Sequence, residues 1–287
     1  MKVGIAFSNI MEFGTPAGAR ALGEAADESG IDSLWTVEHV VVPKDYASRY
    51  PYSRSGRMPG PEESPIPDPL VWISYVAAVT TRVRLATGIL ILPQRSPVIL
   101  AKECASIDVL SQGRFVLGVG IGWLREEFEA IGVPFEERAA RTDEAIQALR
   151  ALWSDDESFN GDHYRFSSAR SYPKPTRGRI PIVVGGHSPA AARRAGRLGD
   201  GFFPSAPDRS QLPGLFDECR RAAAEAGRNT GEIELIGSGG HSVQEAKRLA
   251  DAGATTIVVA PPAFTAADIP AALGRLGEEF VSKIASL

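Results

Sequence analysis

Short apolar runs alternate with helical segments along almost the whole chain, and this alternation constrains the fold more than any other feature. Eight runs rich in β-branched residues are typical of strands, and apolar residues recur at helical spacing between them. Several runs are apolar throughout, as parallel strands buried on both faces are. The predicted strands cover residues 3–7, 33–38, 83–91, 114–121, 180–185, 201–205, 232–237 and 255–260. Eight strands alternating with eight helices predict an α/β fold, a (β/α)8 TIM barrel, in one domain over residues 1–287.

The predicted helix boundaries follow ordinary capping chemistry. Thr15 and Ser188 each precede a proline and are predicted N-caps, because a hydroxyl accepts a backbone N–H and proline suits the first helical position. Ser242 and Glu245 form a capping box. The alternative fold is a doubly wound open sheet. That fold usually carries a G-x-G-x-x-G turn after its first strand, and residues 8–15 contain no such turn.

Two connections are longer than a regular barrel requires, and they predict insertions after the second and fourth strands. Residues 43–69 hold seven of the 21 prolines together with Tyr46, Tyr50 and Tyr52. A loop of this length is either a lid or disordered, and we expect a lid that excludes water from a site. Residues 154–178 predict an inserted hairpin or loop before the fifth strand.

Charge and cysteine content exclude several classes of protein. The formal net charge is −4, so no excess of positive charge is available to neutralise phosphates, and nucleic-acid binding is not expected. No apolar run reaches the roughly 18 residues of a membrane span, and the first residues lack a signal-peptide cleavage site. Cys104 and Cys219 are too few for a disulfide framework, which favours the cytoplasm. His163 and His241 lack partners at metal-binding spacing, so no metal is expected.

The segment from Gly185 through Gly186 and His187 to Ser188 is a candidate phosphate cradle. Glycines let backbone N–H groups approach an anion, and the helix that follows adds unpaired N–H groups and the positive end of its dipole. The same four letters recur at 239–242, which is the alternative cradle. The structural alternative is an ordinary turn that needs glycine and an N-cap.

Glu38 and His39 end the second strand directly before the proline-rich loop. A histidine at a barrel mouth can donate a hydrogen bond or move a proton near neutral pH, and we take both residues as candidate catalytic groups. Thr87, Gly88 and Ile89 lie inside the third strand, where a glycine indicates a bulge or the close approach of a ligand.

Gly118, Gly120 and Gly122 alternate along the end of the fourth strand and precede Trp123. Three glycines at alternate positions predict a bare face on which a flat ring could lie, with Trp123 beside it. Tight packing across the barrel is the structural alternative. The acidic residues at 126–129 are predicted to form a solvated helix face, and Cys104 is predicted to lie in the core.

Taken together, three blocks of this sequence resemble one family. Residues 34–43, 84–123 and 180–204 are similar to the luciferase-like flavin and deazaflavin oxidoreductases, and most similar to the actinobacterial branch that uses coenzyme F420. Arginine outnumbers lysine 25 to 6, which suits a GC-rich actinobacterial genome. The similarity extends over essentially the whole chain.

This resemblance implies a cofactor in the carboxyl-terminal mouth of the barrel. It implies that His39 lies near the reactive face of the ring. It also implies a non-proline cis peptide between Gly88 and Ile89 that supports the ring, and a phosphate loop from Gly185 to Ser188.

The function implied is an F420-dependent oxidoreductase that transfers a hydride between C5 of the deazaflavin and a small organic substrate. The first alternative is an FMN monooxygenase on the same barrel. The second alternative is a barrel that binds a ligand without turnover. Trp123 stands where the sugar-phosphate dehydrogenases of the family carry a glutamate, which argues against glucose 6-phosphate. A homodimer is expected, because members of the family that this chain resembles often dimerise.

Overall fold

Eight parallel strands, with β3 and β4 counted as two parts of one strand, close into a barrel within residues 1–53, 55–205 and 208–287, the part of the chain that the computed structural model describes. The ring closes because β3 pairs with both β2 and β5, and β11 returns to β1. The strands are β1 (Lys2–Ile5), β2 (Ser33–Thr36), β3 (Arg84–Thr87), β4 (Leu90–Ile91), β5 (Phe115–Gly120), β8 (Ile182–Gly185), β9 (Gly201–Phe203), β10 (Glu234–Gly239) and β11 (Thr256–Val259). The predicted (β/α)8 barrel is confirmed.

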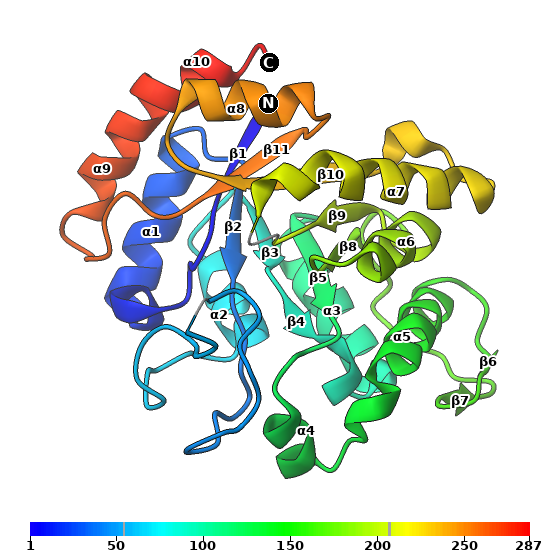
Figure 1. Ribbon diagram of the computed structural model, residues 1–287. Coiled ribbons are helices and arrows are strands. Elements are labelled where there is room, and N and C mark those ends of the chain that lie inside the picture. The colour runs from blue at the N-terminus through cyan, green and yellow to red at the C-terminus, as the bar shows by residue number, and fades with distance from the viewer. Residues whose placement is uncertain (54, 206–207) are drawn as a thin grey trace.

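Helices surround the barrel and connect successive strands (Figure 1). The α-helices are α1 (Pro16–Glu28), α2 (Pro69–Ala77), α3 (Pro97–Leu110), α4 (Arg125–Ile131), α5 (Arg138–Trp153), α6 (Pro189–Leu198), α7 (Leu212–Glu225), α8 (Val243–Asp251), α9 (Ile269–Leu276) and α10 (Ser282–Ile284). Short 3-10 turns are η1 (Met11–Gly14), η2 (Leu92–Gln94), η3 (Phe135–Glu137), η4 (Arg209–Gln211) and η5 (Thr230–Glu232), and a π-turn, η6 (Gly277–Val281), joins α9 to α10.

The predicted N-caps are confirmed, but the capping box forms only in its serine half, because the Glu245 carboxylate accepts the N–H of Gly240 and not that of Ser242. The Thr15, Ser188 and Ser242 hydroxyls accept backbone N–H groups of α1, α6 and α8 at 3.2, 3.2 and 3.4 Å. Each cap satisfies an N–H group that the first helical turn would leave unpaired. Proline occupies the first position of α1, α2, α3 and α6, where its missing N–H costs nothing.

The third barrel strand, predicted over 83–91, is interrupted at Gly88, where the sequence indicates a bulge. Leu85 pairs with Phe115 and Leu90 with Val119, so one extra residue is inserted between β3 and β4. This is a β-bulge, and the bulged segment approaches β5 closely. A Cβ atom on Gly118 would overlap the carbonyl oxygen of Thr87, so β5 needs a glycine at this position.

Trp35 fills the inside of the barrel. Its ring packs edge-on against Phe203, with ring centroids 5.2 Å apart. A Cβ on Gly4 would lie 2.7 Å from its Nε1 atom, and one on Gly88 would lie 3.0 Å from its Cε3 atom. The remaining buried members of this inner cluster are Ala86, Val116, Val183, Ile236 and Val258. The barrel is therefore a packed core below its mouth.

Several predicted boundaries differ from the observed ones. The seventh strand is predicted at 232–237 but observed at 234–239, because Asn229 caps η5 and delays the strand. Residues 154–178 contain a two-stranded antiparallel hairpin, β6 (Phe159–Asn160) and β7 (Arg165–Phe166). The described residues of the 43–69 loop form no strand, and α2 begins at Pro69, the last residue of the loop. Residue 54 lies outside the described residues.

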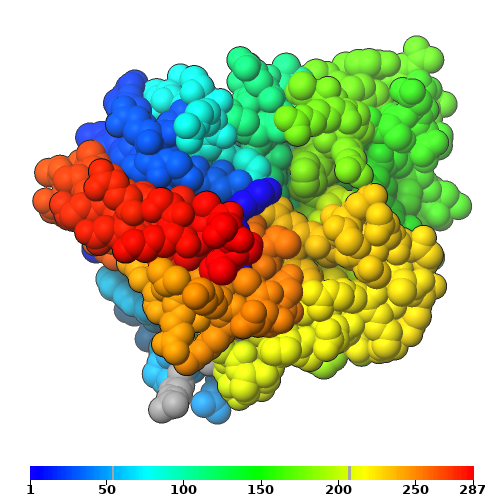
Figure 2. All heavy atoms as spheres, turned by 90° about the horizontal axis from the view of Figure 1, so that it is seen from above, coloured from blue at the N-terminus to red at the C-terminus, as the bar shows by residue number. Residues whose placement is uncertain are grey.

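The two chain ends meet on the amino-terminal side of the barrel (Figure 2). The Met1 ammonium donates hydrogen bonds to the carbonyl oxygens of Ile284 and Leu287, each at 3.0 Å. Of the described helices, none is both long and apolar enough to span a bilayer. Cys104 is fully buried in the core, as predicted.

The close approach at Gly118 predicts a large effect of one methyl group. Gly118→Ala should lower the free energy of unfolding by about 3 kcal/mol or prevent folding, because the new Cβ displaces the backbone of Thr87. Gly274→Ala, in α9 with nothing within 4 Å of a new Cβ, should stabilise by about 0.5–1 kcal/mol. Denaturant unfolding measures both. Equal stability of the two variants would contradict the packing argument.

Candidate active site

The loops that leave the carboxyl ends of the strands gather at one end of the barrel, below the strands in Figure 1. His39 follows β2, Trp123 follows β5 and His187 precedes α6. In a barrel this end carries the active site, because residues from different strands converge there.

His39 is held by a buried carboxylate. Glu127, on α4, is fully buried, and its Oε2 atom lies 3.2 Å from His39 Nδ1. Its Oε1 atom accepts the N–H groups of Val40 at 2.6 Å and Val41 at 3.3 Å. A carboxylate beside Nδ1 requires the proton on that nitrogen, which leaves Nε2 as the ring atom available to a ligand. Glu127 thus fixes both the tautomer and the orientation of His39.

The prediction of a solvated acidic face on α4 is wrong for Glu127 and correct only in part for Glu126. The Glu126 carboxylate accepts the N–H groups of Ala47 at 2.7 Å and Ser48 at 3.0 Å. Burial opposes the charge, but the hydrogen bonds from Ser48 and Ala47 together outweigh it and lower the pKa of Glu126 to about 2. Helix α4 therefore anchors the start of the 43–69 loop at two points.

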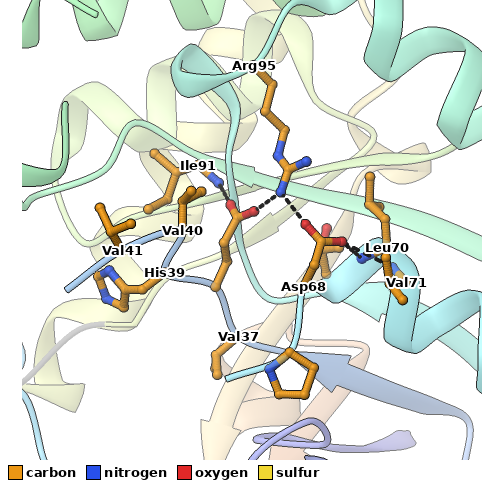
Figure 3. A network of polar contacts seen from close by, with 12 residues as sticks. Val37, His39, Val40, Val41, Asp68, Leu70, Val71, Ile91 and Arg95 are labelled. Atoms are coloured by element: carbon orange, nitrogen blue, oxygen red, sulfur yellow. Dashed lines mark hydrogen bonds and ion pairs between the residues drawn. The ribbon is translucent and has the colours of Figure 1, made fainter. Parts of the chain in front are cut away.

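A second network joins the end of β2 to the bulge and to α2 (Figure 3). Arg95 Nη2 donates to Glu38 Oε1 and, at 2.8 Å, to Asp68 Oδ2. Glu38 Oε2 accepts the Ile91 N–H at 2.5 Å. Asp68 Oδ1 caps α2 by accepting the N–H of Leu70 at 2.9 Å and of Val71 at 3.1 Å. In Figure 3 the His39 ring points to the opposite side from Arg95.

The charges in this network depend on one another. The Glu38 side chain is 1% exposed, and burial raises its pKa despite the guanidinium beside it. Burial disfavours the charge on Arg95, but Glu38 and Asp68 together raise the pKa of Arg95 above its ordinary value. Both Glu38 oxygens hold neighbouring segments in place. The geometry therefore gives Glu38 a positioning task, and its predicted catalytic task stays a prediction.

The bulge brings Ile89 into the mouth. The peptide bond between Gly88 and Ile89 is cis, as the resemblance implies. A Cβ on Gly120 would lie 2.5 Å from Ile89 Cδ1, and one on Gly185 would lie 2.6 Å from Ile89 Cγ2. The predicted bare face on the fourth strand is therefore corrected, because Ile89 fills the space that Gly120 leaves.

Two other predicted site residues lie within the wall of the barrel. The buried Thr87 hydroxyl donates to the Gly118 carbonyl oxygen at 2.6 Å, which ties β3 to β5. Gly122 has φ of +79°, and a Cβ there would lie 2.7 Å from Phe128 and 2.8 Å from Ile91. Both residues shape the wall, and neither contact involves His39.

A chain of aromatic rings runs from one side of the mouth to the other. Trp123 contacts His39, Tyr46 and Tyr50, with ring centroids 5.8, 5.5 and 5.2 Å apart. Tyr50 contacts Tyr52 at 5.3 Å, and Tyr52 contacts His187 at 5.1 Å. The 43–69 loop thereby reaches both sides of the mouth, as a lid would; closure over a ligand stays a prediction.

The turn at 185–188 is open to an anion. Gly186 has φ of +131°, and a Cβ there would lie 2.7 Å from Ala191 Cβ, so the turn requires glycine. Ser188 caps α6, and no carboxylate contacts the Gly186 or His187 N–H in the part of the chain that the structure describes. His187 Nδ1 is buried without a hydrogen-bond partner among those residues.

The alternative cradle at 239–242 is already occupied by a side chain. Glu245 Oε2 accepts the Gly240 N–H at 2.7 Å, and Arg209 pairs with the same carboxylate. An anion at this turn would meet a negative charge, so the turn at 185–188 is the better phosphate site. Across the described ranges, no group of three or more His, Cys, Asp or Glu side chains is placed to hold a metal ion.

Sequence reasoning missed four residues that build this site: Asn9, Asp68, Arg95 and Glu127. Asp68 precedes Pro69, an N-cap signal that the sequence does contain. The buried Asn9 amide donates to the Val37 and Pro67 carbonyl oxygens and accepts the Val37 N–H. No local pattern marks Asn9, Arg95 or Glu127, because their partners are distant in the chain.

Comparison with known proteins gives consistent matches over the barrel. A family model described as luciferase-like monooxygenase matches residues 5–277. An uncharacterized protein of Mycobacterium tuberculosis is 36% identical over 240 residues, which cover 83% of each chain. The F420-dependent glucose-6-phosphate dehydrogenase of Kineococcus radiotolerans is 32% identical over 216 residues, 73% of this chain and 59% of that protein. Monooxygenase RslO1 from Streptomyces bottropensis has a crystal structure that matches with a TM-score of 0.75 and 27% identity, covering 98% of this chain and 99% of that one.

The Glu38–Arg95 pair predicts an asymmetric effect on stability. Arg95→Met should cost about 3–5 kcal/mol at pH 7, because it leaves the Glu38 charge buried with only the Ile91 N–H. Glu38→Gln should cost less, since Arg95 keeps Asp68 as a partner. The loss in Arg95→Met should shrink as the pH falls, because burial raises the pKa of Glu38 and removal of Arg95 raises it further, so that the buried carboxylate protonates.

Denaturant unfolding of both single variants and the double variant provides the test. The double variant should lose less stability than the two single losses combined, because the residues are in contact. Additive losses would show that the pair does not act as one unit.

Proposed function

Because the chain belongs to the luciferase-like monooxygenase family and is an oxidoreductase, we propose that it uses F420 and transfers a hydride between C5 of the deazaflavin and a small organic substrate. The observation that carries the proposal is the arrangement of Ile89, His39 and the amino-terminal end of α6 around one mouth. These are the positions that the family resemblance assigns to the ring, the reacting centre and the phosphate.

The residues around this mouth suit such a cofactor. The unencumbered N–H groups at Gly186 and His187, together with the dipole of α6, would hold a phosphate. The buried, unpartnered Nδ1 of His187 is a further polar atom available to a ligand. The Ile89 side chain, in the space left by Gly120 and Gly185, would support one face of a flat ring.

The chain itself contributes orientation and proton transfer, and a bound deazaflavin would supply hydride chemistry at C5. With Nδ1–H directed to Glu127, the neutral His39 ring would accept a proton at Nε2 from a substrate hydroxyl, and the imidazolium form would donate one from Nε2 to a substrate oxygen in the reducing direction. In the reducing direction, the substrate carbon gains the hydride and its oxygen gains the proton as the carbonyl π bond breaks. The aromatic rings of the 43–69 loop would exclude water during the step.

F420 is favoured over FMN by the F420-dependent relative, which is 32% identical over 73% of this chain. The alternative, an FMN monooxygenase, is favoured by the likeness to monooxygenase RslO1, which is 27% identical to this chain. Trp123 argues against a sugar phosphate, because an indole ring cannot replace a carboxylate in proton transfer. A small uncharged molecule fits the mouth better.

Anaerobic titration with F420 and with FMN tests the choice of cofactor. We expect the dissociation constant for F420 to be at least tenfold lower than that for FMN. Replacing Gly186 with Ala should weaken binding of either phosphate-bearing cofactor, because a Cβ disturbs the turn. Tight FMN binding without F420 binding would favour the monooxygenase, and binding of neither would favour a barrel that has no redox cofactor.

His39→Gln tests proton transfer. It should lower kcat by about 100-fold or more, because a positioned general acid contributes on this scale, while the dissociation constant for F420 changes little. His163→Gln is the matched control, since His163 pairs with Glu137 away from the mouth. An unchanged rate in His39→Gln would remove His39 from the mechanism.

A further inference from the structure

The loop after β1 holds two bulky residues in the left-handed backbone conformation. Phe7 has φ of +55° and Met11 has φ of +54°. This conformation brings Cβ close to the carbonyl oxygen, so it favours glycine or asparagine and disfavours a large side chain. When such residues persist, the surrounding structure must enforce them, and such positions gather at functional sites.

The enforcing contacts lie between the two residues. Ser8 and Asn9 are fully buried. The Ser8 N–H donates to the Trp35 carbonyl oxygen at 3.0 Å, and the Ser8 hydroxyl donates to the Ile5 carbonyl oxygen at 3.0 Å. The Asn9 amide bonds to both backbone groups of Val37, two residues before His39. The loop is thereby clamped to the strand end that carries His39.

In this loop the polar side chains are buried and the apolar ones are exposed, the reverse of the usual distribution in proteins. Its polar residues Ser8 and Asn9 are buried, while Phe7 is 44% exposed and Met11 is 59% exposed. Burial of apolar surface therefore repays little of the cost of the left-handed conformation. Val40 and Val41, which follow His39, are also exposed large apolar residues. β1 and β2 are neighbours, and the Asn9–Val37 hydrogen bonds join the loops that follow them, so these exposed apolar residues belong to adjacent loops on one side of the mouth. Exposed apolar side chains on the loops of a mouth indicate a ligand-binding surface.

The two buried carboxylates beside His39 are already paired. Glu127 is engaged by His39, Val40 and Val41, and Glu38 is engaged by Arg95 and Ile91. Below them the barrel presents Trp35 and its apolar neighbours. A charged substrate at His39 would lose its hydration without gaining a free counter-ion from these groups. An uncharged apolar substrate would not incur that cost.

We infer that Phe7 and Met11 are specificity-determining residues and that the substrate is an uncharged, largely apolar carbonyl compound. The redox step in this inference rests on the proposed function, whereas the binding surface formed by Phe7 and Met11 does not. Apolar contact with Phe7 and Met11 orients the substrate, and its carbonyl oxygen faces His39 Nε2.

Asparagine substitutions separate this role from a structural one. Phe7→Asn and Met11→Asn should keep or raise the melting temperature, because asparagine tolerates the left-handed conformation. The same variants should raise KM for an apolar ketone tenfold or more and leave F420 binding unchanged. Gln112→Asn is the matched control, since Gln112 has φ of +57° at the end of α3, away from the mouth. Gln112→Asn should change the melting temperature in the same direction as the two loop variants and leave KM for the ketone unchanged.

Two compounds test the substrate class: 1-tetralone and a tetralone that bears a carboxylate. Turnover with reduced F420 measures their reaction, and calorimetry with and without the cofactor measures their dissociation constants. We expect 1-tetralone to bind at least tenfold more tightly than the carboxylate, and Phe7→Asn to remove this preference. Equal or tighter binding of the carboxylate, no binding of 1-tetralone, or an unchanged KM in both asparagine variants would overturn the inference. Failure of F420 to bind, with the tetralone preference intact, would overturn only the proposed function.

Discussion

Three segments distant in the chain depend on one guanidinium. Arg95 joins the end of β2 through Glu38, the bulge through the Glu38–Ile91 contact, and the start of α2 through Asp68. The carboxylates of Glu38 and Asp68 together compensate the Arg95 cation, which is mostly removed from water. Loss of Arg95 would leave the Glu38 charge buried without a counter-ion, whereas loss of either carboxylate would still leave Arg95 one ion-pair partner. His39 follows Glu38 directly, and Ile89 precedes β4, so the positions of the candidate acid and of the ring support both depend on this network. A planar guanidinium suits this task because one nitrogen can donate toward two carboxylates at once.

Sequence reasoning recovered the features that have a local physical cause and missed those that depend on distant partners. Eight strand-like runs and the caps at Thr15, Ser188 and Ser242 follow from local periodicity and side-chain hydrogen bonding, and the barrel follows from their alternation. The cis peptide at Gly88–Ile89 came from family resemblance, since no local pattern demands it. Glu127 was predicted to be solvated because an acidic run on a helix usually is, and its burial is caused by His39, 88 residues away. The glycines of β5 were correctly singled out, but the neighbour they accommodate is protein, namely Thr87 and Ile89.

Helix α4 couples the candidate acid to the loop above it. Glu127 is fully buried and holds His39 with Val40 and Val41, whereas Glu126 is half-buried and holds Ala47 and Ser48. The Glu127 contacts are the costlier ones to break, because a fully buried carboxylate left without partners loses more free energy than one that water can partly reach. Since the pKa of Glu126 is lowered to about 2, its contact persists at neutral pH and weakens only under strong acid.

The loop after β1 shows how stability and specificity oppose each other in this barrel. A chain selected for stability alone would place glycine or asparagine at positions 7 and 11 and would bury the apolar side chains elsewhere. This chain instead buries Ser8 and Asn9 and uses their hydrogen bonds to hold Phe7 and Met11 at the surface. The cost of the two left-handed conformations, of order 1 kcal/mol each, is offset by the clamp rather than by burial. The clamp ends at Val37, two residues before His39, so the hydrogen bonds that fix the loop also fix the strand end from which His39 projects.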